Sequence, residues 1–165
     1  MHVSHGRSGQ PSEQRTATFT GTVHMDPVLT APGVMINTVI FTPGARTHWH
    51  RHPGGQLLVV TAGRGIVATR DGDTEVVTSG DVIWAAPGEE HWHGACGDSL
   101  LTHMAVSHGT TEWGGEVGEV AILAPTAGPF ADKLAQGSCH QAWVERLRSA
   151  RALAWRMAMK SMVWT

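Results

Sequence analysis

The chain has 165 residues, enough for one domain with a sizeable hydrophobic core and too few for two comfortable domains. Hydrophobic residues make up 41% of the sequence and charged residues 16%, and the formal net charge is -2. This balance excludes a disordered chain and does not favour a protein that binds nucleic acid or a membrane surface through strong charge.

Residues 1–17 are polar and are expected to form a flexible N-terminal arm. This arm lacks the apolar core of a secretion signal, and no run of about 18 apolar residues occurs in the chain. The only cysteines, Cys96 and Cys139, are too few for a disulfide framework. We therefore expect a cytoplasmic protein without a membrane span.

Residues 18–110 consist of short β-favouring runs separated by turn residues. The runs cover residues 34–41, 56–61, 65–69, 74–77, 81–84 and 100–106, and dipeptides such as Pro43-Gly44, Ser79-Gly80 and Pro87-Gly88 separate them. This regular spacing predicts an all-β barrel or sandwich. Because no long helical segments alternate with the runs, a parallel α/β sheet is not expected.

Residues 111–165 form a Gly/Pro/Ala-containing connection followed by a helix-like basic tail. Residues 132–165 carry six Lys/Arg against two Asp/Glu. Apolar residues in the tail recur at alternating steps of four and three, as in an amphipathic helix, at Trp143, Leu147, Ala150, Ala154 and Met157. We expect this helix to pack on the barrel or on a partner subunit. A basic membrane-surface helix and a poorly ordered extension are the alternatives.

The eleven histidines are the unusual feature of the composition, because imidazole is the commonest metal ligand in proteins. His48, His50 and His52 alternate in the stretch 43–56, so a strand there places all three on one face. Such a face can offer two imidazoles to one ion at about 2.0–2.2 Å each. Gln56, after the following turn, can add its amide oxygen.

A second Pro-Gly turn, in the stretch 86–95, carries His91 and His93. A single His-x-His pair is most often a pair of ordinary strand histidines that face solvent. Two such turns about 40 residues apart in a β-patterned chain predict a metal site instead.

These stretches resemble the two sequence motifs of the cupin family. The first motif is Gly, five residues, His-x-His, three or four residues, Glu, six residues, Gly, and it is matched with Gln in place of Glu by Gly44, His50, His52, Gln56 and Gly63. The second is Gly, five residues, Pro-x-Gly, two residues, His, three residues, Asn. It is matched by Gly80, Gly88 and His91, with Ala86 and Ala95 at the Pro and Asn positions.

The resemblance implies a single cupin domain, a conserved barrel or jelly roll, that holds one divalent metal ion with His50, His52, Gln56 and His91. Parity alone would allow His48 in place of His52, but the motif spacing selects His52. All four ligands are neutral, so the ion would keep its full charge and act as a stronger Lewis acid than with the usual Glu. Mn(II) is the expected ion, with Fe(II), Ni(II), Co(II) or Zn(II) as alternatives.

The chain is more narrowly similar to the bacterial cupin hydroxynitrile lyases, manganese-containing enzymes that cleave or form cyanohydrins such as mandelonitrile. The matching stretches are GTV-x-x-DP at 21–27, PGART-x-WH-x-HP-x-GQ at 43–56, VTAG at 60–63, GDV-x-W-x-x-PGE-x-HWHGA at 80–95 and TH-x-A at 102–105. The resemblance implies a carbon-carbon lyase.

Within that resemblance, His103 matches the general base, and His93 is the next candidate for this role. A hydrogen-bonded core histidine is the alternative reading of His103. Asn37, Val39 and Ser107 match positions that line the substrate pocket. Asn37 stands where those lyases commonly have a small residue, and Ser107 stands where they have Gln.

Two other functions also fit the same barrel. One is a cupin dioxygenase acting on a small organic substrate, which needs a redox-active ion, and the other is a non-catalytic barrel that binds a small ligand through the ion. Small cupins commonly pair through barrel edges, so we expect a homodimer or homotetramer. A small-molecule substrate is expected, with neither nucleic acid nor membrane as a partner.

Overall fold

The computed structural model describes residues 1–6 and 11–118 of the chain. The tail that is expected to form a helix from about residue 140 lies outside the described residues, and so does Cys139. Within the described residues, no helix is long and apolar enough to cross a membrane.

The described part of the chain is all-β, which confirms the fold class predicted from the sequence. Its strands are β1 (Glu13–Arg15), β2 (Phe19–Thr20), β3 (Val23–Ala31), β4 (Val34–Phe41), β5 (Arg46–Thr47), β6 (His50–Arg51), β7 (Gln56–Thr69), β8 (Thr74–Thr78), β9 (Val82–Ala85), β10 (His91–Ala95), β11 (Leu101–His108) and β12 (Glu112–Trp113).

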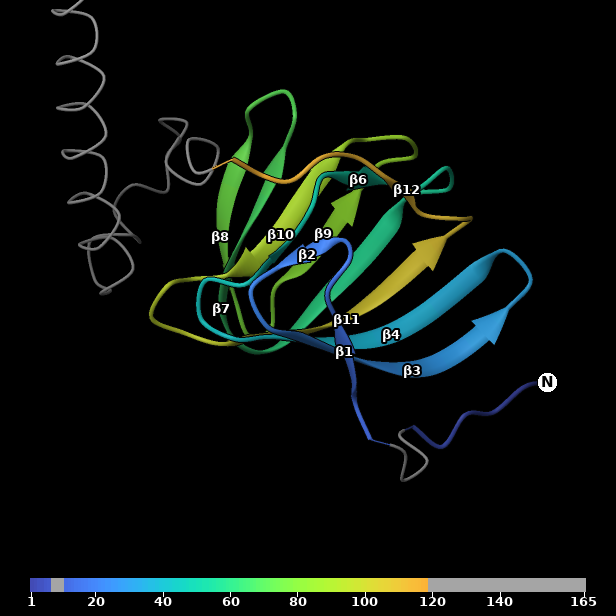
Figure 1. Ribbon diagram of the computed structural model, residues 1–165. Coiled ribbons are helices and arrows are strands. Elements are labelled where there is room, and N and C mark those ends of the chain that lie inside the picture. Colours follow the sequence, from blue (N-terminus) through green and yellow to red (C-terminus); the bar gives the residue numbers. More distant parts are fainter. Residues whose placement is uncertain (7–10, 119–165) are drawn as a thin grey trace, which may run out of the picture.

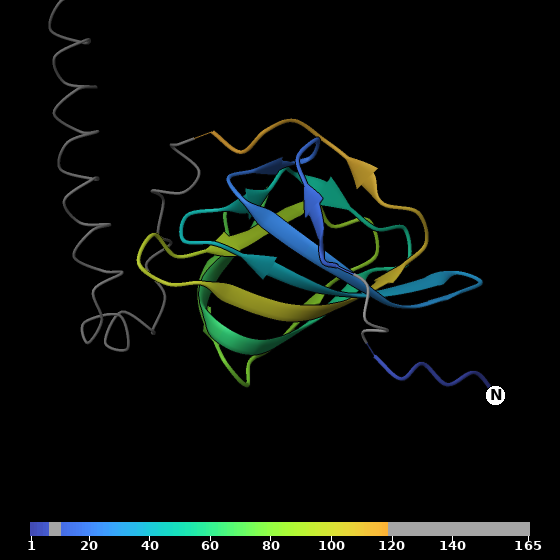
Figure 2. The same ribbon diagram turned by 60° about the horizontal axis from the view of Figure 1, so that its bottom comes forward.

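Two facing sheets share one long strand, β7. The order of hydrogen-bonded neighbours is β1-β3-β4-β11-β7-β10-β5-β2, and β8 and β9 also pair with β7. The first half of β7 pairs with β11 and β9, and its second half pairs with β10 and β8. The strands therefore curve around a common centre as a barrel, from which the β3–β4 hairpin projects (Figure 1, Figure 2).

Gly63 lies where β7 passes from one sheet to the other. The two β-favouring runs expected at 56–61 and 65–69 are joined here into one strand. The φ angle of Gly63 is +78°, and a Cβ added to it would overlap the carbonyl oxygen of Leu100. Both conditions require glycine, because a side chain is strained at positive φ and has no space at this contact.

Strand alternation determines which side chains enter the barrel. On β11, the buried positions are Leu101, His103, Ala105 and Ser107, and the residues between them are less buried. The interior of the barrel is apolar at the Leu101 end, where Phe41 lies opposite in the neighbouring strand. Toward the Ser107 end the interior becomes polar, so the fold places buried polar groups at one end of the barrel.

Trp49 and Trp92 belong to a second, smaller apolar cluster with Ala68 and Val117. Arg70 covers this cluster, with its guanidinium carbon 4.0 Å from the Trp49 ring centre. Strand β10 is therefore buried on both faces, with Trp92 on one and His91 and His93 on the other. The two tryptophans therefore serve in packing and do not contribute to the polar interior.

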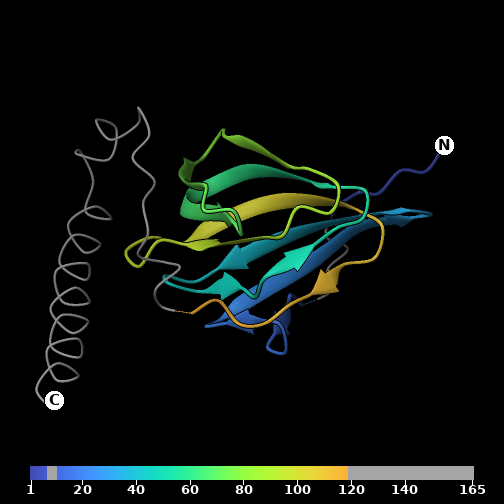
Figure 3. The ribbon, with the colours of Figure 1, turned by 90° about the horizontal axis from the view of Figure 1, so that it is seen from above.

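Segments on either side of the barrel sequence also pair with it. Residues 13–15, within the stretch expected to be a flexible arm, form β1 and pair with β3. Residues 112–113, within the expected connection, form β12, which pairs with β6 and places Trp113 opposite His50. Figure 3 shows the segment that contains β12 running along the outer side of the barrel.

We predict that Gly63→Ala destabilises the protein far more than Gly88→Ala. The two glycines have nearly the same φ, +78° and +77°, but a Cβ at Gly88 has no atom within 4 Å. The strain at positive φ alone costs about 1–2 kcal/mol, whereas the additional overlap at Gly63 raises the loss to about 4 kcal/mol or more. Urea unfolding measures both values. Equal losses in the two variants would contradict the proposed backbone contact.

Candidate metal centre

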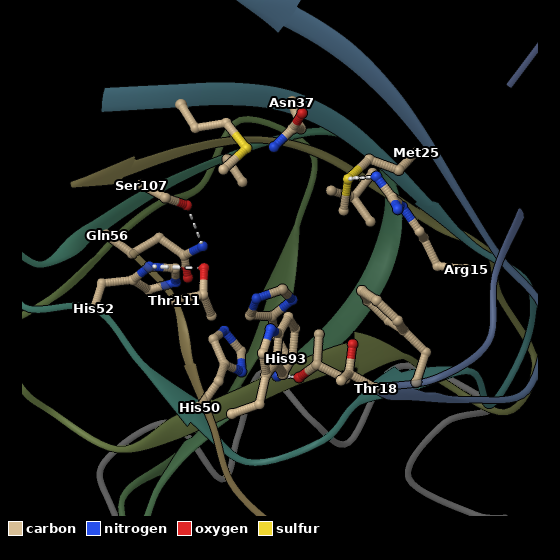
Figure 4. A pocket seen from close by; sticks show the side chains of 16 residues that line it. Arg15, Thr18, Met25, Asn37, His50, His52, Gln56, His93, Ser107 and Thr111 are labelled. Atoms are coloured by element: carbon tan, nitrogen blue, oxygen red, sulfur yellow. Dashed lines mark hydrogen bonds between the residues drawn. The ribbon is translucent and has the colours of Figure 1, made fainter. Parts of the chain in front are cut away.

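A cavity of about 240 Å³ opens at the polar end of the barrel. The side chains of His50, His52, Gln56 and His93 line it, and Figure 4 shows them gathered on one side. The volume lies just below the range of about 300–1,000 Å³ that is usual for small-molecule sites. The cavity therefore has room for a small ligand beside a cluster of imidazoles.

Three histidines lie closely enough to hold one metal ion. His50, His91 and His93 each offer a ring nitrogen, and these atoms all lie within 4.8 Å of one another. Their positions follow from the antiparallel pairing of β6 with β10, which places His50 directly opposite His91. His93 follows His91 by two residues in β10, so both side chains point to the same face of the strand. The pairing of β6 with β10 therefore brings all three histidines together.

Backbone carbonyls orient two of these rings. His50 Nδ1 lies 3.0 Å from the carbonyl oxygen of His48, and His91 Nδ1 lies 2.9 Å from that of Glu89. A carbonyl only accepts, so each Nδ1 carries the proton and each Nε2 has a free lone pair. Metal-ligating histidines are held in this way.

The contact between His91 and Gln56 also fits a cation. Gln56 Nε2 donates to the hydroxyl of Ser107 at 2.9 Å, which leaves Gln56 Oε1 2.8 Å from His91 Nε2. Because the proton of His91 lies on Nδ1, two lone pairs face each other. Two ligand atoms at right angles around one ion, each about 2.1 Å from it, lie about 3.0 Å apart. A cation would satisfy both atoms.

His52 and His93 have equivalent surroundings. His52 Nδ1 lies 3.4 Å from the Thr111 hydroxyl, and His93 Nδ1 lies 3.1 Å from His103 Nε2. The Nε2 atoms of both rings are buried and have no hydrogen-bond partner among the described residues. Such orphaned atoms are costly unless a ligand satisfies them. The group of three includes His93 and not His52.

The other residues singled out in the sequence fall into two classes. Asn37, Val39 and Ser107 line the cavity. His103 is fully buried and is not among the lining residues, so among the described residues His93 stands between it and the cavity. His48 does not line the cavity either, and its carbonyl supports His50.

Comparison with known proteins identifies the fold family. Residues 37–107, from within β4 to within β11, match the family model described as a cupin domain. An (R)-mandelonitrile lyase from Granulicella tundricola is 50% identical over 91 residues, which cover 53% of this chain and 70% of that protein. The chain belongs to the cupin family. The fold and the resemblance expected from the two motifs are thereby confirmed.

Solved structures agree with this cupin assignment. A cupin-like protein from Thermotoga maritima is 35% identical, with a TM-score of 0.66 over 73% of this chain and 98% of that chain. A polyketide cyclase from Streptomyces resistomycificus shares the fold at 16% identity, with a TM-score of 0.59 over 87% of this cupin and 99% of that chain.

Several cavity residues of this cupin were not found from the sequence. Arg15 and Phe19 come from the N-terminal strands, and Thr111 and Trp113 come from the segment around β12. The Trp113 ring lies against His50, with 4.9 Å between ring centres. Trp113 is an aromatic residue in a Gly-rich connection, which is a usable signal, but a three-residue strand such as β1 has no periodicity that would reveal Arg15.

Burial determines the protonation of the histidines in this cupin. It lowers the pKa of His50 to about 3 and the pKa of His52 to about 4, in each case with His91 as the next contribution. Burial also lowers the pKa of His103 to about 4 and holds the pKa of His93 well below its usual value. At neutral pH the cluster is therefore neutral and its lone pairs can bind a cation.

We predict that the metal-free cupin loses stability as the pH falls from about 6.5 toward 4. Over this window the histidines of the unfolded chain bind protons, whereas the buried histidines of the folded protein stay neutral. Each such histidine therefore lowers the free energy of unfolding by about 1.4 kcal/mol for each unit by which the pH falls. The stability is fully present above pH 6.5. Urea unfolding in a chelator at pH 7.5, 6.0 and 5.0 measures the slope.

Two variants serve as controls for this pH dependence. His103→Gln removes one buried imidazole and is expected to reduce the slope. His24→Gln changes a strand histidine outside the cluster and is expected to retain the slope. If wild-type protein were as stable at pH 5.0 as at pH 7.5, the histidines would not be buried in neutral form.

Proposed function

We propose that this cupin is a metal-dependent lyase that interconverts a cyanohydrin with an aldehyde and hydrogen cyanide. The observation that carries the proposal is the 50% identity to a protein named (R)-mandelonitrile lyase. Two features of the cavity support it: a cluster of histidines close enough to hold an ion, and the hydrogen bond between one of them, His93, and His103.

In this proposal the ion would be Mn(II), and its ligands would be His50, His52, Gln56 and His91. These ligands are neutral imidazoles and an amide, a set that suits first-row divalent ions. When bound, the ion supplies Lewis-acid polarisation of an oxygen substituent of the substrate. Ser107 orients the Gln56 amide so that its oxygen and not its nitrogen faces His91.

His93 and His103 act together as the proton carrier. The His93 ring lines the cavity and can touch a substrate, whereas His103 reaches the cavity only through its contact with His93 Nδ1. If His93 donates its Nδ1 proton to His103, its Nε2 lone pair faces the cavity as a base. The general-base role expected for His103 therefore passes to His93, and His103 becomes a positioning residue.

The reaction balances with these groups alone. In cleavage, His93 Nε2 takes the hydroxyl proton, the carbonyl double bond forms, and the bond to the nitrile carbon breaks with its electron pair leaving on cyanide. His93 then returns the proton to cyanide, which leaves as hydrogen cyanide. Val39 and Ala105 line the cavity with apolar side chains, against which the rest of the substrate can pack.

Ser107→Ala is predicted to weaken binding of the metal by about 10- to 100-fold, the usual effect of losing a residue that orients a ligand. Without its hydroxyl partner the Gln56 amide can rotate and present its nitrogen, which is not a ligand. Competition with a chromophoric chelator for Mn(II) measures the affinity. Ser99→Ala, at a half-buried serine that does not line the cavity and whose hydroxyl contacts the Leu100 carbonyl, is the control. Unchanged affinity in Ser107→Ala would remove Gln56 from the ligand set.

His93→Ala is predicted to keep its metal and to lower kcat for mandelonitrile cleavage by about 10²- to 10⁴-fold, the usual size of a general acid-base contribution. His103→Ala is expected to keep its metal, to lose less activity and to change the pH profile, because it holds the tautomer of His93. Benzaldehyde release and elemental analysis measure rate and metal content.

The outcomes of this experiment separate the alternatives. Loss of metal in His93→Ala but not in His52→Ala would make His93 a ligand and remove His52 from the set. If wild-type protein released no benzaldehyde but consumed oxygen with a small organic substrate, it would be a dioxygenase. Tight binding of small ligands without turnover would make it a binding protein.

A further inference from the structure

Arg15 is the one side chain lining the cavity, among the described residues, that carries a formal charge at neutral pH. No Asp or Glu side chain of the described residues lines the cavity, and its other polar groups are hydroxyls, amides and imidazoles. Arg15 therefore places a positive charge on the wall of the cavity itself.

Strand β1 fixes the position of Arg15. Arg15 pairs with Val23 of β3, and it contacts Met25, which lies two residues further along β3 and also lines the cavity. Figure 4 shows Arg15 and Met25 on the side of the cavity away from Gln56 and His52. The guanidinium and the histidine cluster therefore stand on different sides of the space that a ligand would fill.

The hydrogen bonds of Arg15 leave part of its guanidinium unsatisfied. Its Nη2 lies 3.0 Å from a carboxylate oxygen of Glu13 and 3.6 Å from the sulfur of Met25. The Glu13 side chain is 57% exposed, so water screens this ion pair, and a thioether is a weak acceptor. Arg15 Nε is buried and has no hydrogen-bond partner among the described residues. The Arg15 side chain as a whole is 42% exposed, so the buried group is this one Nε–H donor, and a ligand oxygen in the cavity would give it an acceptor.

We propose that Arg15 is a specificity-determining residue that selects substrates carrying a carboxylate on the end remote from the reacting carbon. A carboxylate is the planar acceptor that matches two donors of one guanidinium. Apolar side chains, among them Phe19 and Val39, line the cavity as well, so the substrate joins its carboxylate to the reacting carbon through an apolar spacer. The reaction at that carbon rests on the proposed lyase function, but the binding preference does not.

The binding arm of the test uses ligands that cannot react. Calorimetry on the purified full chain with its metal compares 3- and 4-(hydroxymethyl)benzoate with their neutral counterpart, benzyl alcohol. At least one of the two carboxylates is expected to bind about 10- to 100-fold more tightly than benzyl alcohol, the worth of a charge-assisted hydrogen bond in a partly buried site. Arg15→Gln is expected to abolish this preference, and Arg15→Lys to retain part of it.

Glu13→Gln is the matched control, because it removes the exposed partner of Arg15 and leaves the guanidinium in place. It is expected to keep the preference for the carboxylate. Absence of a preference in wild type would overturn the proposal. An equal loss of affinity for both ligands in Arg15→Gln would also overturn it, because Arg15 would then only support the wall of the cavity.

The kinetic arm compares the cyanohydrins of benzaldehyde and of 3- and 4-carboxybenzaldehyde. The ratio of KM for the neutral substrate to KM for the preferred carboxylate substrate is expected to fall about 10- to 100-fold in Arg15→Gln. If wild type binds the carboxylate preferentially but cleaves none of these cyanohydrins, the lyase function fails and the role of Arg15 stands. Turnover with no difference in KM ratio between wild type and Arg15→Gln overturns the role of Arg15 and leaves the lyase function intact.

Discussion

The pairing of His50 with His91 across β6 and β10 is the constraint on which the site depends. Because side chains alternate along a strand, a shift of one residue in this register would turn His91 and His93 away from the cavity and bring Trp92 into it. Packing holds the register from the opposite face, where Trp92 lies in an apolar cluster with Trp49. Gly94 contributes because the backbone of Ala45 and Arg46 lies where a side chain would stand. The tryptophans that touch no ligand thus determine where the imidazoles point.

The cluster has an energetic cost in the absence of a cation. Four histidines are each at most 3% exposed: His50, His91, His93 and His103. Two of their ring nitrogens, His93 Nε2 and His103 Nδ1, have no partner in the described part of the chain. Burial keeps these rings neutral, so each ring has one N–H donor and one lone pair, and lone pairs that face each other inside the cluster cannot satisfy one another. The apolar half of the barrel, centred on Phe41 and Leu101, supplies the stability that offsets this cost. The apolar end of the interior thus stabilises the fold, and the polar end carries the groups that can bind a ligand.

The sequence predicted the barrel well because its signals are local. The resemblance to the cupin lyases implied that Asn37, Val39, His103 and Ser107 lie at the pocket, and all four occupy buried positions of the alternating strands β4 and β11. Parity could not decide between His48 and His52, and it placed His93 on the same face as His91 without saying which of them is a ligand. The distances that separate them depend on how β6 and β10 approach each other, which is a tertiary property. The extent of β3 was also missed, because Pro27 interrupts the pattern at a bulge.

The residues that the sequence could not reveal come from outside the two cupin motifs, and this has a chemical consequence. In the proposed function the motif residues would hold an ion, and the geometry of ligation restricts their spacing. Arg15 and Trp113 come from short strands at either end of the described barrel, where they contact the cavity without touching the spacing of the ligands. Arg15 can change without disturbing the histidine cluster, whereas Trp113 lies against His50. If both proposals hold, the choice of substrate is separable from the chemistry at the ion, and likeness in the motifs carries information about the latter only.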